Sequence, residues 1–225
     1  MKTWRFARLT HPGPAGAGKS SASRALARRL GFGYVDTGAM YRAVGVLAAE
    51  RGIDPDDAAA LGRLVAGLDF ELARDGERLL VGGRDLSAAI RRPDAGELAS
   101  RISTHPAVRQ RLVALQRALG AGGGVVMEGR DIGTVVFPDA PVKLYLTADP
   151  TARAARRAAE LRARAERVDE AALARELAER DRRDAARAHS PLRPAADAIV
   201  LDTTALTLEE VVDRMERLVR ERAPA

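Results

Sequence analysis

The sequence predicts an α/β fold with a doubly wound parallel sheet. Residues 122–131 (GGGVVMEGRD) and 142–149 (VKLYLTAD) each contain an apolar run that ends at polar residues. Runs of this kind are typical of strands buried on both faces of a parallel sheet. Segments with helical spacing separate the strands, and this alternation indicates a doubly wound arrangement. Ligands bind at the carboxyl ends of such strands, so the polar residues there are candidates for function.

The N-terminal part begins this alternation. A short strand is expected over about residues 6–11, where it runs into a glycine-rich loop. A helix follows over about 18–30, because alanine and leucine recur there at helical spacing and a glycine supplies the stop. GYVD, residues 33–36, is typical of a brief second strand, and a helix resumes near Gly38.

The pattern changes between residues 66 and 103. Short apolar segments are broken there at 75–76 (Asp-Gly) and 82–83 (Gly-Gly), which are hairpin signals. We expect a small antiparallel insert followed by short helices. A charged helical region over about 150–188 is expected to break once near 166–169, and the chain closes as strand, loop and helix.

Length and composition bound the class of protein. The 225 residues are enough for one domain with a substantial core, or for a core and a small insert. The absence of cysteine excludes disulfides, thiolate metal sites and a cysteine nucleophile. The N-terminal MKTWRFARLT lacks the apolar region of a signal peptide, and the apolar runs are too short to cross a bilayer. We therefore expect a cytoplasmic protein.

The formal net charge of +6 raises the question of nucleic-acid binding. The cations are almost all arginine, with lysine only at positions 2, 19 and 143, and they are spread along helices. This distribution favours solvated helix faces, or arginines that bind phosphorylated small molecules. A non-catalytic protein that binds nucleic acid stays open as an alternative, with steeply salt-dependent binding as its mark.

GPAGAGKS, residues 13–20, has the spacing Gly-x-x-x-x-Gly-Lys-Ser of a phosphate-binding P-loop. Glycines permit the backbone angles that turn successive N–H groups toward a phosphate, and the following helix adds its positive N-terminal end. Lys19 can bridge the β- and γ-phosphates of a nucleoside triphosphate, and the Ser20 hydroxyl can ligate Mg²⁺. The predicted nucleotide-binding residues are Gly13, Pro14, Ala15, Gly16, Ala17, Gly18, Lys19, Ser20 and Ser21.

Arginine and aspartate gather in three further motifs. DTGAMYR contains Asp36, Thr37 and Arg42; EGRDIGT contains Glu128, Arg130 and Asp131; and ERDRRDAAR contains Arg180, Asp184 and Arg187 on one helix face. One such face is more often an exposed ladder of ion pairs, whereas three groups near strand ends indicate a polyanionic acceptor held by arginine forks. The NKxD motif of GTPases is absent, and the length leaves little room for a motor ATPase.

These motifs together resemble bacterial cytidylate kinases (CMP kinases). The resemblance runs from about residue 9 to 220 and rests on GPAGAGKS, DTGAMYR, EGRDIGTVVFPDAPVKLYL and ERDRRDAARAHSPLRPA. It implies a P-loop kinase with a core over 1–65, 104–157 and 171–225, an NMP-binding insert over 66–103 and a short helical lid over 158–170. The implied reaction transfers a phosphoryl group from ATP, with Mg²⁺, to CMP and dCMP. We expect a monomer that binds these small molecules and neither nucleic acid nor membrane.

The resemblance also implies roles on the acceptor side. Asp36 and Thr37 would belong to the acceptor site; Arg42, Arg130 and Arg187 would hold the acceptor phosphate; Arg180 and Asp184 would contact the sugar; and Ser100, Arg109 and Asp131 would read the cytosine. The last set is chemically sensible. The amino group of cytosine can donate a hydrogen bond to a carboxylate, and its two acceptor atoms can accept hydrogen bonds from arginine. Uracil reverses two of these groups, and buried polar mismatches discriminate strongly.

The expected mechanism needs no general base, because the acceptor phosphate is already an anionic nucleophile. The protein has to align two polyanions and spread positive charge over the transferred group. The expected catalytic residues are Lys19, Arg130, Arg153, Arg157 and Arg187, and the expected Mg²⁺ contacts are Ser20 and, through water, Glu128. Arg153 and Arg157 lie one turn apart on the helix that enters the lid, where solvated helix charge is the alternative interpretation.

The chain departs from the family pattern just before the P-loop. His11 and Pro12 stand where the family usually has isoleucine and aspartate, so a carboxylate is lost and proline removes a backbone donor. We expect a shortened strand or weaker support beneath the loop. His105 and His189 are isolated and receive no role, and the LDTTAL loop after the last strand is a candidate for contacting adenine.

Two further interpretations stay open. A different small P-loop kinase, acting on UMP, another nucleoside monophosphate or a small metabolite, would share the P-loop but not the reader formed by Ser100, Arg109 and Asp131. An inactive family member rests only on the Pro12 departure, since the loop residues that touch phosphate are all present. In an active kinase, the lid and the insert are expected to close over the substrates and exclude water.

Overall fold

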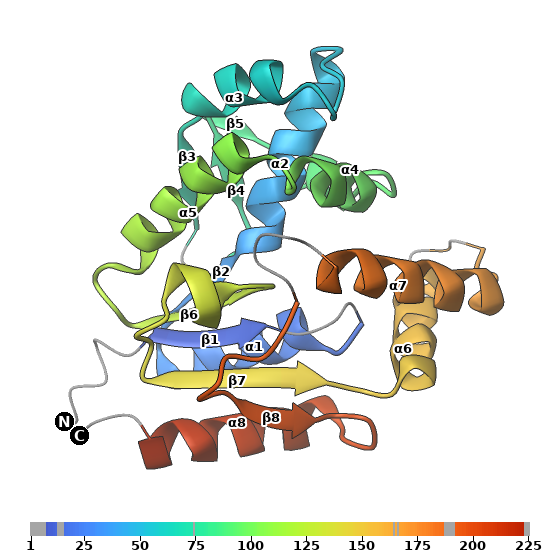
Figure 1. Cartoon of the computed structure of the whole chain (residues 1–225). Helices are drawn as coiled ribbons and strands as arrows, with labels where there is room; N and C mark the ends of the chain where they lie inside the picture. Colours follow the sequence, from blue (N-terminus) through green and yellow to red (C-terminus); the bar gives the residue numbers. More distant parts are fainter. Residues whose placement is uncertain are drawn as a thin grey trace.

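A five-stranded parallel sheet with the order β2-β6-β1-β7-β8 forms the centre of the computed structural model (Figure 1). Its strands are β1 (Arg8–Pro12), β2 (Gly33–Asp36), β6 (Val125–Gly129), β7 (Val142–Thr147) and β8 (Ile199–Asp202). The structure describes residues 8–12, 16–73, 75–163, 165, 167–186 and 192–222, without the side chains of residues 8–12, Arg180 and Asp184. The strand order places β1 between strands that follow it in the chain, which confirms the predicted doubly wound α/β fold.

Parallel pairing brings the carboxyl ends of the strands to one edge of the sheet. Asp36 of β2 and His11 of β1 both lie opposite Glu128 of β6. β1 includes Pro12, opposite Gly129, so the expected strand over 6–11 reaches one residue further than predicted. The proline is accommodated because it is the last residue of the strand, where a missing N–H interrupts little of the ladder.

Eight α-helices of the described residues connect and cover the strands. They are α1 (Lys19–Leu30), α2 (Thr37–Glu50), α3 (Ala58–Ala66), α4 (Ala95–Ile102), α5 (Pro106–Gly120), α6 (Pro150–Arg162), α7 (Glu170–Ala185) and α8 (Leu208–Arg222). α1 lies between Gly18 and Gly31, whose φ angles of 79° and 67° belong to the left-handed region that favours glycine. Asp36 and Asp169 cap α2 and α7 by accepting hydrogen bonds from backbone N–H groups of the first turn. Among the residues that the structure describes, no helix is both long enough and apolar enough to span a membrane.

Different helices cover the two faces of the sheet. On one face, Leu26 of α1 and Met215 of α8 pack with Leu144 of β7. On the other face, Val113 of α5 packs with Phe137, which follows a π-helix, η3 (Ile132–Val136). The turn between β6 and β7 is therefore pressed against α5.

A second group of elements lies above the sheet in Figure 1. Its strands β3 (Phe70–Leu72), β4 (Leu79–Val81) and β5 (Arg84–Asp85) form an antiparallel sheet, which confirms the expected hairpins. Gly82 and Gly83 both have positive φ angles, of 56° and 77°, as the tight turn between β4 and β5 requires. A short 3₁₀-helix, η2 (Ala89–Arg91), then leads into α4.

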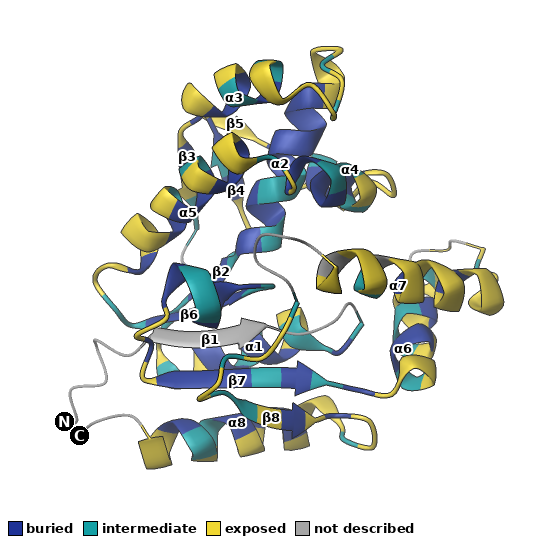
Figure 2. Ribbon diagram, in the orientation of Figure 1, coloured by how far each residue is buried: buried dark blue, intermediate teal, exposed yellow. Residues whose placement is uncertain are grey.

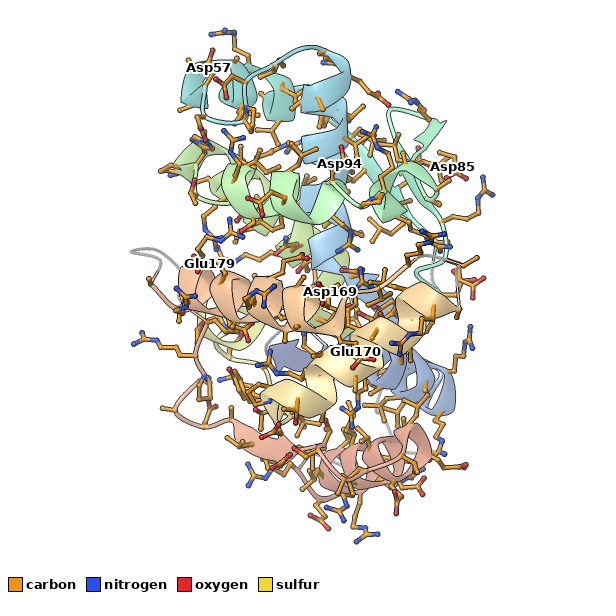
Figure 3. The ribbon with its side chains drawn as sticks, turned by 90° about the vertical axis from the view of Figure 1, so that its right-hand side faces the viewer. Asp57, Asp85, Asp94, Asp169, Glu170 and Glu179 are labelled. Atoms are coloured by element: carbon orange, nitrogen blue, oxygen red, sulfur yellow. The ribbon has the colours of Figure 1, made fainter. Side chains whose placement is uncertain are left out.

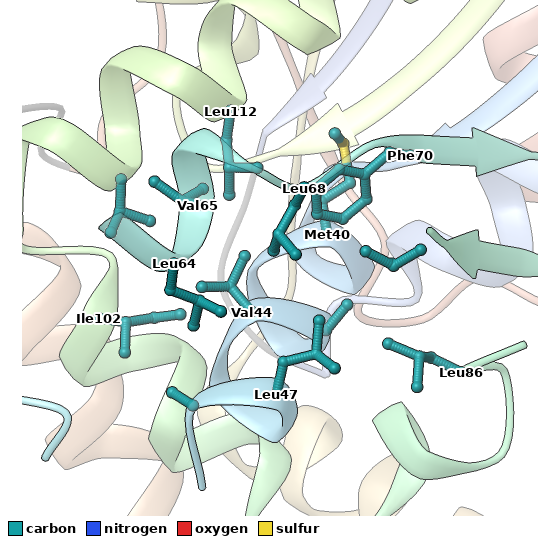
Figure 4. Close-up of a cluster of buried hydrophobic side chains, with 14 of the residues drawn as sticks. Met40, Val44, Leu47, Leu64, Val65, Leu68, Phe70, Leu86, Ile102 and Leu112 are labelled. Carbon is teal, nitrogen blue, oxygen red and sulfur yellow. The ribbon is translucent and has the colours of Figure 1, made fainter. Parts of the chain in front are cut away.

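This second group has its own hydrophobic cluster (Figure 4). Met40 and Val44 of α2 pack there with Val65 of α3, Ile102 of α4 and Leu112 of α5. The expected insert over 66–103 is therefore packed on α2, α3 and α5. The domain boundaries themselves stay a prediction.

α6 and α7 form a helical hairpin that faces the viewer in Figure 3, where Asp169 and Glu170 mark the start of α7. The expected break in the charged region is confirmed, because α6 ends at Arg162. The apolar contact within the hairpin is small and consists of Ala154, Ala158, Leu173 and Leu177, with the partly buried Leu161 and Val168. Figure 2 shows that most of α7 is exposed.

The C-terminal end of α7 bears on one prediction. The helix ends at Ala185, so it contains Arg180 and Asp184 and stops before Arg187, which lies outside the described residues. Because Arg187 and the side chains of Arg180 and Asp184 are not described, the prediction that the three residues share one helix face stays a prediction. The expected lid over 158–170 falls at the tip of the α6–α7 hairpin and stays a prediction.

Candidate active site

Asp36 and Arg42 form an ion pair where β2 ends and α2 begins. Arg42 Nη2 donates to Asp36 Oδ2 at 2.7 Å, and Asp36 Oδ1 accepts from the backbone N–H of Ala39 at 3.0 Å. Burial opposes the charge, but the Arg42 guanidinium and the backbone hydrogen bond hold the pKa of Asp36 below its usual value. The carboxylate therefore stays charged and orients Arg42 at the edge of the sheet.

Glu128 lies beside this pair and is 4% exposed. Its Oε1 accepts hydrogen bonds from Ser20 Oγ at 2.6 Å and from the Tyr34 hydroxyl at 2.8 Å. Its Oε2 has no hydrogen-bond partner among the described residues. Burial and the charge of Asp36 raise the pKa of Glu128 to about 7, while Lys19 and the two hydroxyls oppose the shift. A cation would supply the interaction that Oε2 lacks.

The groups around Glu128 fit Mg²⁺. This ion prefers oxygen ligands and usually keeps several waters while one or two protein groups and substrate phosphates complete its shell. The buried Oε2 of Glu128 and the Ser20 hydroxyl next to it are oxygens of that kind. They lie at the first turn of α1, where a nucleotide phosphate is expected.

The described part of the P-loop depends on two glycines. Gly16 and Gly18 have φ angles of 76° and 79°, which other residues rarely adopt. A Cβ on Gly16 would lie 2.9 Å from the carbonyl oxygen of Arg153, so the loop also packs closely on α6. Lys19 follows as the first residue of α1, and its charge acts on the buried carboxyl groups of both β2 and β6. Gly13, Pro14 and Ala15 lie outside the described residues.

A cavity of about 200 Å³ opens beside the P-loop. Its wall includes Ser21, Arg156, Glu160, Thr203, Leu206 and Val211. Arg156 Nη1 donates to Thr203 Oγ1 at 3.0 Å, and the Thr203 hydroxyl lies 3.3 Å from the carbonyl oxygen of Ala17. The LDTTAL loop is thus joined to both α6 and the P-loop, and its contact with adenine stays a prediction.

Arg109 of α5 and Asp131, two residues beyond β6, form a buried ion pair. Their side chains are only 10% and 8% exposed. Arg109 Nη1 also donates to the Ser103 carbonyl at 3.4 Å, and the Ser103 hydroxyl donates to the Ser100 carbonyl at 2.8 Å. The structure therefore brings the three predicted base-reading residues into one network, with Ser103 as a link that the sequence analysis missed.

The two arginines expected at the entry to the lid have different surroundings. Arg153 is buried, pairs with Asp181 of α7, and donates from Nε to the Ala148 carbonyl at 3.2 Å. Arg157, one turn later, pairs with Glu160 of its own helix at 2.9 Å and its side chain is 38% exposed. Arg153 is thus held in one place, whereas the Arg157 pair is accessible to solvent.

Tyr145 of β7 is half-buried and responds to the charges of Arg130, which directly follows β6, and of Arg153 in α6. Burial raises the pKa of Tyr145, Arg130 and Arg153 lower it, and Asp181 raises it. Among the other predicted residues, Thr37 is buried and donates to the Glu128 carbonyl at 2.8 Å, so it stabilises the end of β6.

Tyr34 and Arg156 are site residues that the sequence analysis also missed. Tyr34 carries the one hydroxyl in the GYVD strand, and a buried tyrosine usually needs a partner for its hydroxyl, which is the signal that could have indicated it. Arg156 lies between two predicted arginines, on a helix rich in arginine, so no spacing distinguishes it. Its partners come from the loop after β8, which only folding brings near.

Comparison with known proteins extends these observations to nearly the whole chain. A sequence profile described as cytidylate kinase matches residues 9–221. A cytidylate kinase of Geobacter sp. (strain M21) is 51% identical over 212 residues, which cover 93% of this chain and 91% of the relative. One of Pelotomaculum thermopropionicum is 50% identical over 210 residues, covering 92% and 93%.

Solved structures with the same fold include a gluconokinase from Sinorhizobium meliloti and a shikimate kinase from Bacteroides thetaiotaomicron. Both have a TM-score of 0.51, with 15% and 13% sequence identity, and cover 97% and 95% of this chain and 94% and 98% of their own. Likeness at this identity shows a shared fold alone. Identity of about half over more than nine-tenths of both sequences shows more: the chain belongs to the cytidylate kinase family.

Proposed function

We propose that this chain transfers the γ-phosphoryl group of ATP to CMP and dCMP, giving ADP and CDP or dCDP. Family membership supports the activity. The choice of acceptor is supported by one observation: the P-loop and the Arg109–Asp131 pair both contact residues at or just beyond the end of β6. Glu128 there contacts the P-loop through Ser20, and Asp131 pairs with Arg109. The P-loop and the pair that we propose reads the base thus both contact residues at the end of this strand.

The Arg109–Asp131 pair suits cytosine. A carboxylate has several acceptor positions and a guanidinium has five donors, so each can contact a base while it pairs with the other. Asp131 would accept from the N4 amino group, and Arg109 would donate to O2 or N3. Uracil would present O4 to the carboxylate, which leaves two acceptors facing each other in a buried site.

The acceptor phosphate would be held by Arg42, Arg130 and Arg187. Asp36 orients the Arg42 fork, and only its Nη2 group is used in that ion pair. Arg130 follows directly on β6, in the same turn as Asp131. Contacts of Arg180 and Asp184 with the sugar rest on the resemblance to the family.

Phosphoryl transfer would rely on alignment and charge. Lys19 would neutralise the β- and γ-phosphates, and Arg153, held in place by Asp181, would approach the transferred group together with Arg157. Ser20 and, through water, Glu128 would hold Mg²⁺, which supplies charge neutralisation when it is bound. The adenine would occupy the cavity between Arg156 and the LDTTAL loop. The proposed partners are small molecules only, and the proposed protein is a cytoplasmic monomer.

A coupled assay for ADP release tests the proposal, with CMP, dCMP, UMP, AMP, GMP and no acceptor offered in parallel with ATP and Mg²⁺. Fast release with CMP and dCMP alone is expected. Equal release without an acceptor would mean an NTPase, and release with another acceptor would mean a kinase with a different base reader. Absence of a mobility shift with nucleic acid at low salt would dismiss the nucleic-acid-binding alternative. Lys19→Met is the matched control, because it should abolish release while leaving the fold intact.

A further inference from the structure

We propose that Arg117 of α5 is a positioning residue for base selection and acts on Asp131 through the π-helix η3. The inference rests on the proposed function, because it concerns how Asp131 is held to read the acceptor base. Arg117 lies outside the set of residues predicted from the sequence. Its partners are backbone carbonyls of η3, so it would act without touching a substrate.

The π-helix fixes the backbone of Asp131. The Val136 N–H donates to the Asp131 carbonyl at 3.3 Å and the Phe137 N–H donates to the Ile132 carbonyl at 2.7 Å, which are bonds across five residues. The Asp131 carbonyl also accepts from the N–H groups of Thr134 and Val135, at 3.2 and 2.8 Å. Single turns of π-helix are rare and occur frequently at functional sites. Here the turn begins at the residue that pairs with Arg109.

Arg117 holds the opposite end of this turn. Its Nη2 donates to the Val135 carbonyl at 2.7 Å and its Nε donates to the Val136 carbonyl at 3.1 Å. The last carbonyls of a helix have no partner within it, and Arg117 satisfies two of them. One turn later on α5, Gly120 makes room for Phe137: a Cβ at Gly120 would lie 2.6 Å from the Phe137 ring. A hydrogen-bonded fork and a close steric contact thus hold the same end.

α5 therefore holds the segment from Asp131 to Phe137 at both ends. Arg109 pairs with the Asp131 carboxylate, and Arg117, two turns later on the same helix, supports the final carbonyls. Direct pairing orients the carboxylate, while the π-helix sets the backbone from which it projects. Both interactions come from the same helix, α5, so the position of Asp131 relative to Arg109 is fixed.

Loss of Arg117 should let the turn relax. The Asp131 carbonyl already accepts from Val135, the bond of an α-helix, as well as from Val136, the bond of a π-helix. The two patterns are thus close in geometry, and support at the far end selects between them. A change to the α pattern would rotate the backbone at Asp131 and misplace its carboxylate relative to a bound base.

The experiment compares Arg117→Gln, Gly120→Ala and Arg111→Gln with the wild type, in the intact protein. Arg111 is the matched control: it lies on the same helix and donates to one backbone carbonyl, that of Leu68 at 3.1 Å, away from η3. The measurements are kcat/KM for CMP and for UMP, KM for ATP, and Tm. Arg117→Lys tests rescue, because an ammonium can still reach one of the two carbonyls.

Arg117→Gln and Gly120→Ala should each lower the ratio of kcat/KM for CMP over UMP by about tenfold, with KM for ATP changed by less than about twofold. Arg117→Lys should recover part of the ratio, and Arg111→Gln should keep it. A purely structural role would lower Tm and the active fraction but leave the ratio of the surviving enzyme unchanged.

Two results would overturn the proposal: wild-type ratios in both Arg117→Gln and Gly120→Ala, or an equal loss in Arg111→Gln. If Arg117→Gln does not fold, Gly120→Ala decides alone by the same criterion. A wild type with no preference for CMP would overturn the base reader itself, and is distinguished because the defect then precedes any substitution.

Discussion

Glu128 and Asp131 are both buried at the end of β6, yet their surroundings are opposite. The Asp131 carboxylate is paired with the guanidinium of Arg109. The Glu128 carboxylate receives two hydroxyl groups, and its Oε2 has no hydrogen-bond partner in the part of the chain that the structure describes. A buried charge is costly unless it is paired, so the first arrangement is complete without a ligand and the second favours a cation.

The difference comes from the two helices that face the strand end. On the P-loop side, α1 presents the backbone of a helix N-terminus and the hydroxyl of Ser20, which suit phosphate and metal. On the opposite side, α5 presents a rigid arginine, which suits a neutral base with a fixed hydrogen-bond pattern. We therefore expect one strand end to serve both the phosphate donor and the acceptor base.

The largest effect should follow from Glu128→Gln. The change keeps the shape but removes the charge that would hold Mg²⁺ through water, and kcat should fall by roughly 100- to 1000-fold. The measurement is kcat over a titration of MgCl₂. Glu71→Gln, an exposed carboxylate on β3, is the control. Turnover within about threefold of the wild type would remove Glu128 from the metal site.

Asp131→Asn should weaken both base selection and the buried ion pair with Arg109. The amide would turn a donor toward the cytosine amino group, so the CMP over UMP ratio should fall by about 100-fold. The buried Arg109 would lose the charge of its partner, at a cost of about 3 kcal/mol in the free energy of unfolding. Steady-state kinetics and urea unfolding measure the two effects. Asp94→Asn removes an exposed partner of Arg92 and should cost less than about 1 kcal/mol. An unchanged ratio would refute the assignment of the reader.

The pH dependence of stability should show how the Glu128 carboxyl, held by two hydroxyl groups, differs from Asp131, which has a charged partner. The pKa of Glu128 is about 7 in the folded chain against 4.5 for an ordinary glutamate, so the folded state binds the extra proton. The resulting stabilisation is fully present below pH 4.5 and is lost as the pH rises through 7. Without nucleotide or metal, the free energy of unfolding of the wild type relative to Glu128→Gln should fall by up to about 3 kcal/mol between pH 4.5 and 8. Parallel stability curves for the two proteins would contradict this expectation.

The smallest effect should come from Tyr34→Phe. It removes one of the two hydroxyls that hold Glu128 Oε1 but keeps the ring, which packs closely on Gly76 of the β3–β4 turn. We expect kcat to fall by about three- to tenfold, the size of one ordinary hydrogen bond. Tyr145→Phe, in a half-buried tyrosine of β7, is the control. Equal behaviour of the two variants would mean that the Tyr34 hydroxyl does not position Glu128.

Features of the fold that depend on neighbouring residues could be predicted from the sequence, whereas features that depend on distant residues could not. The hairpins at 75–76 and 82–83 were predicted because glycine at a positive φ is a requirement of a single turn. The π-helix was not predicted, since hydrogen bonds across five residues leave no periodic pattern of apolar residues. Pro12 was expected to disturb the strand before the P-loop, but neighbouring strands on both sides support β1.

The sequence by itself determined the order of strands and helices, the phosphate-binding loop and the residue types gathered at the strand ends, because each depends on neighbours a few positions away. Only the tertiary structure decided which of these charges are neutralised. Ser20 and Glu128 are 108 residues apart in the chain, Tyr34 and Glu128 are 94 apart, and Arg109 and Asp131 are 22 apart. Burial and pairing at such separations depend on how the helices pack on the sheet, and that packing sets the charge of a buried carboxyl.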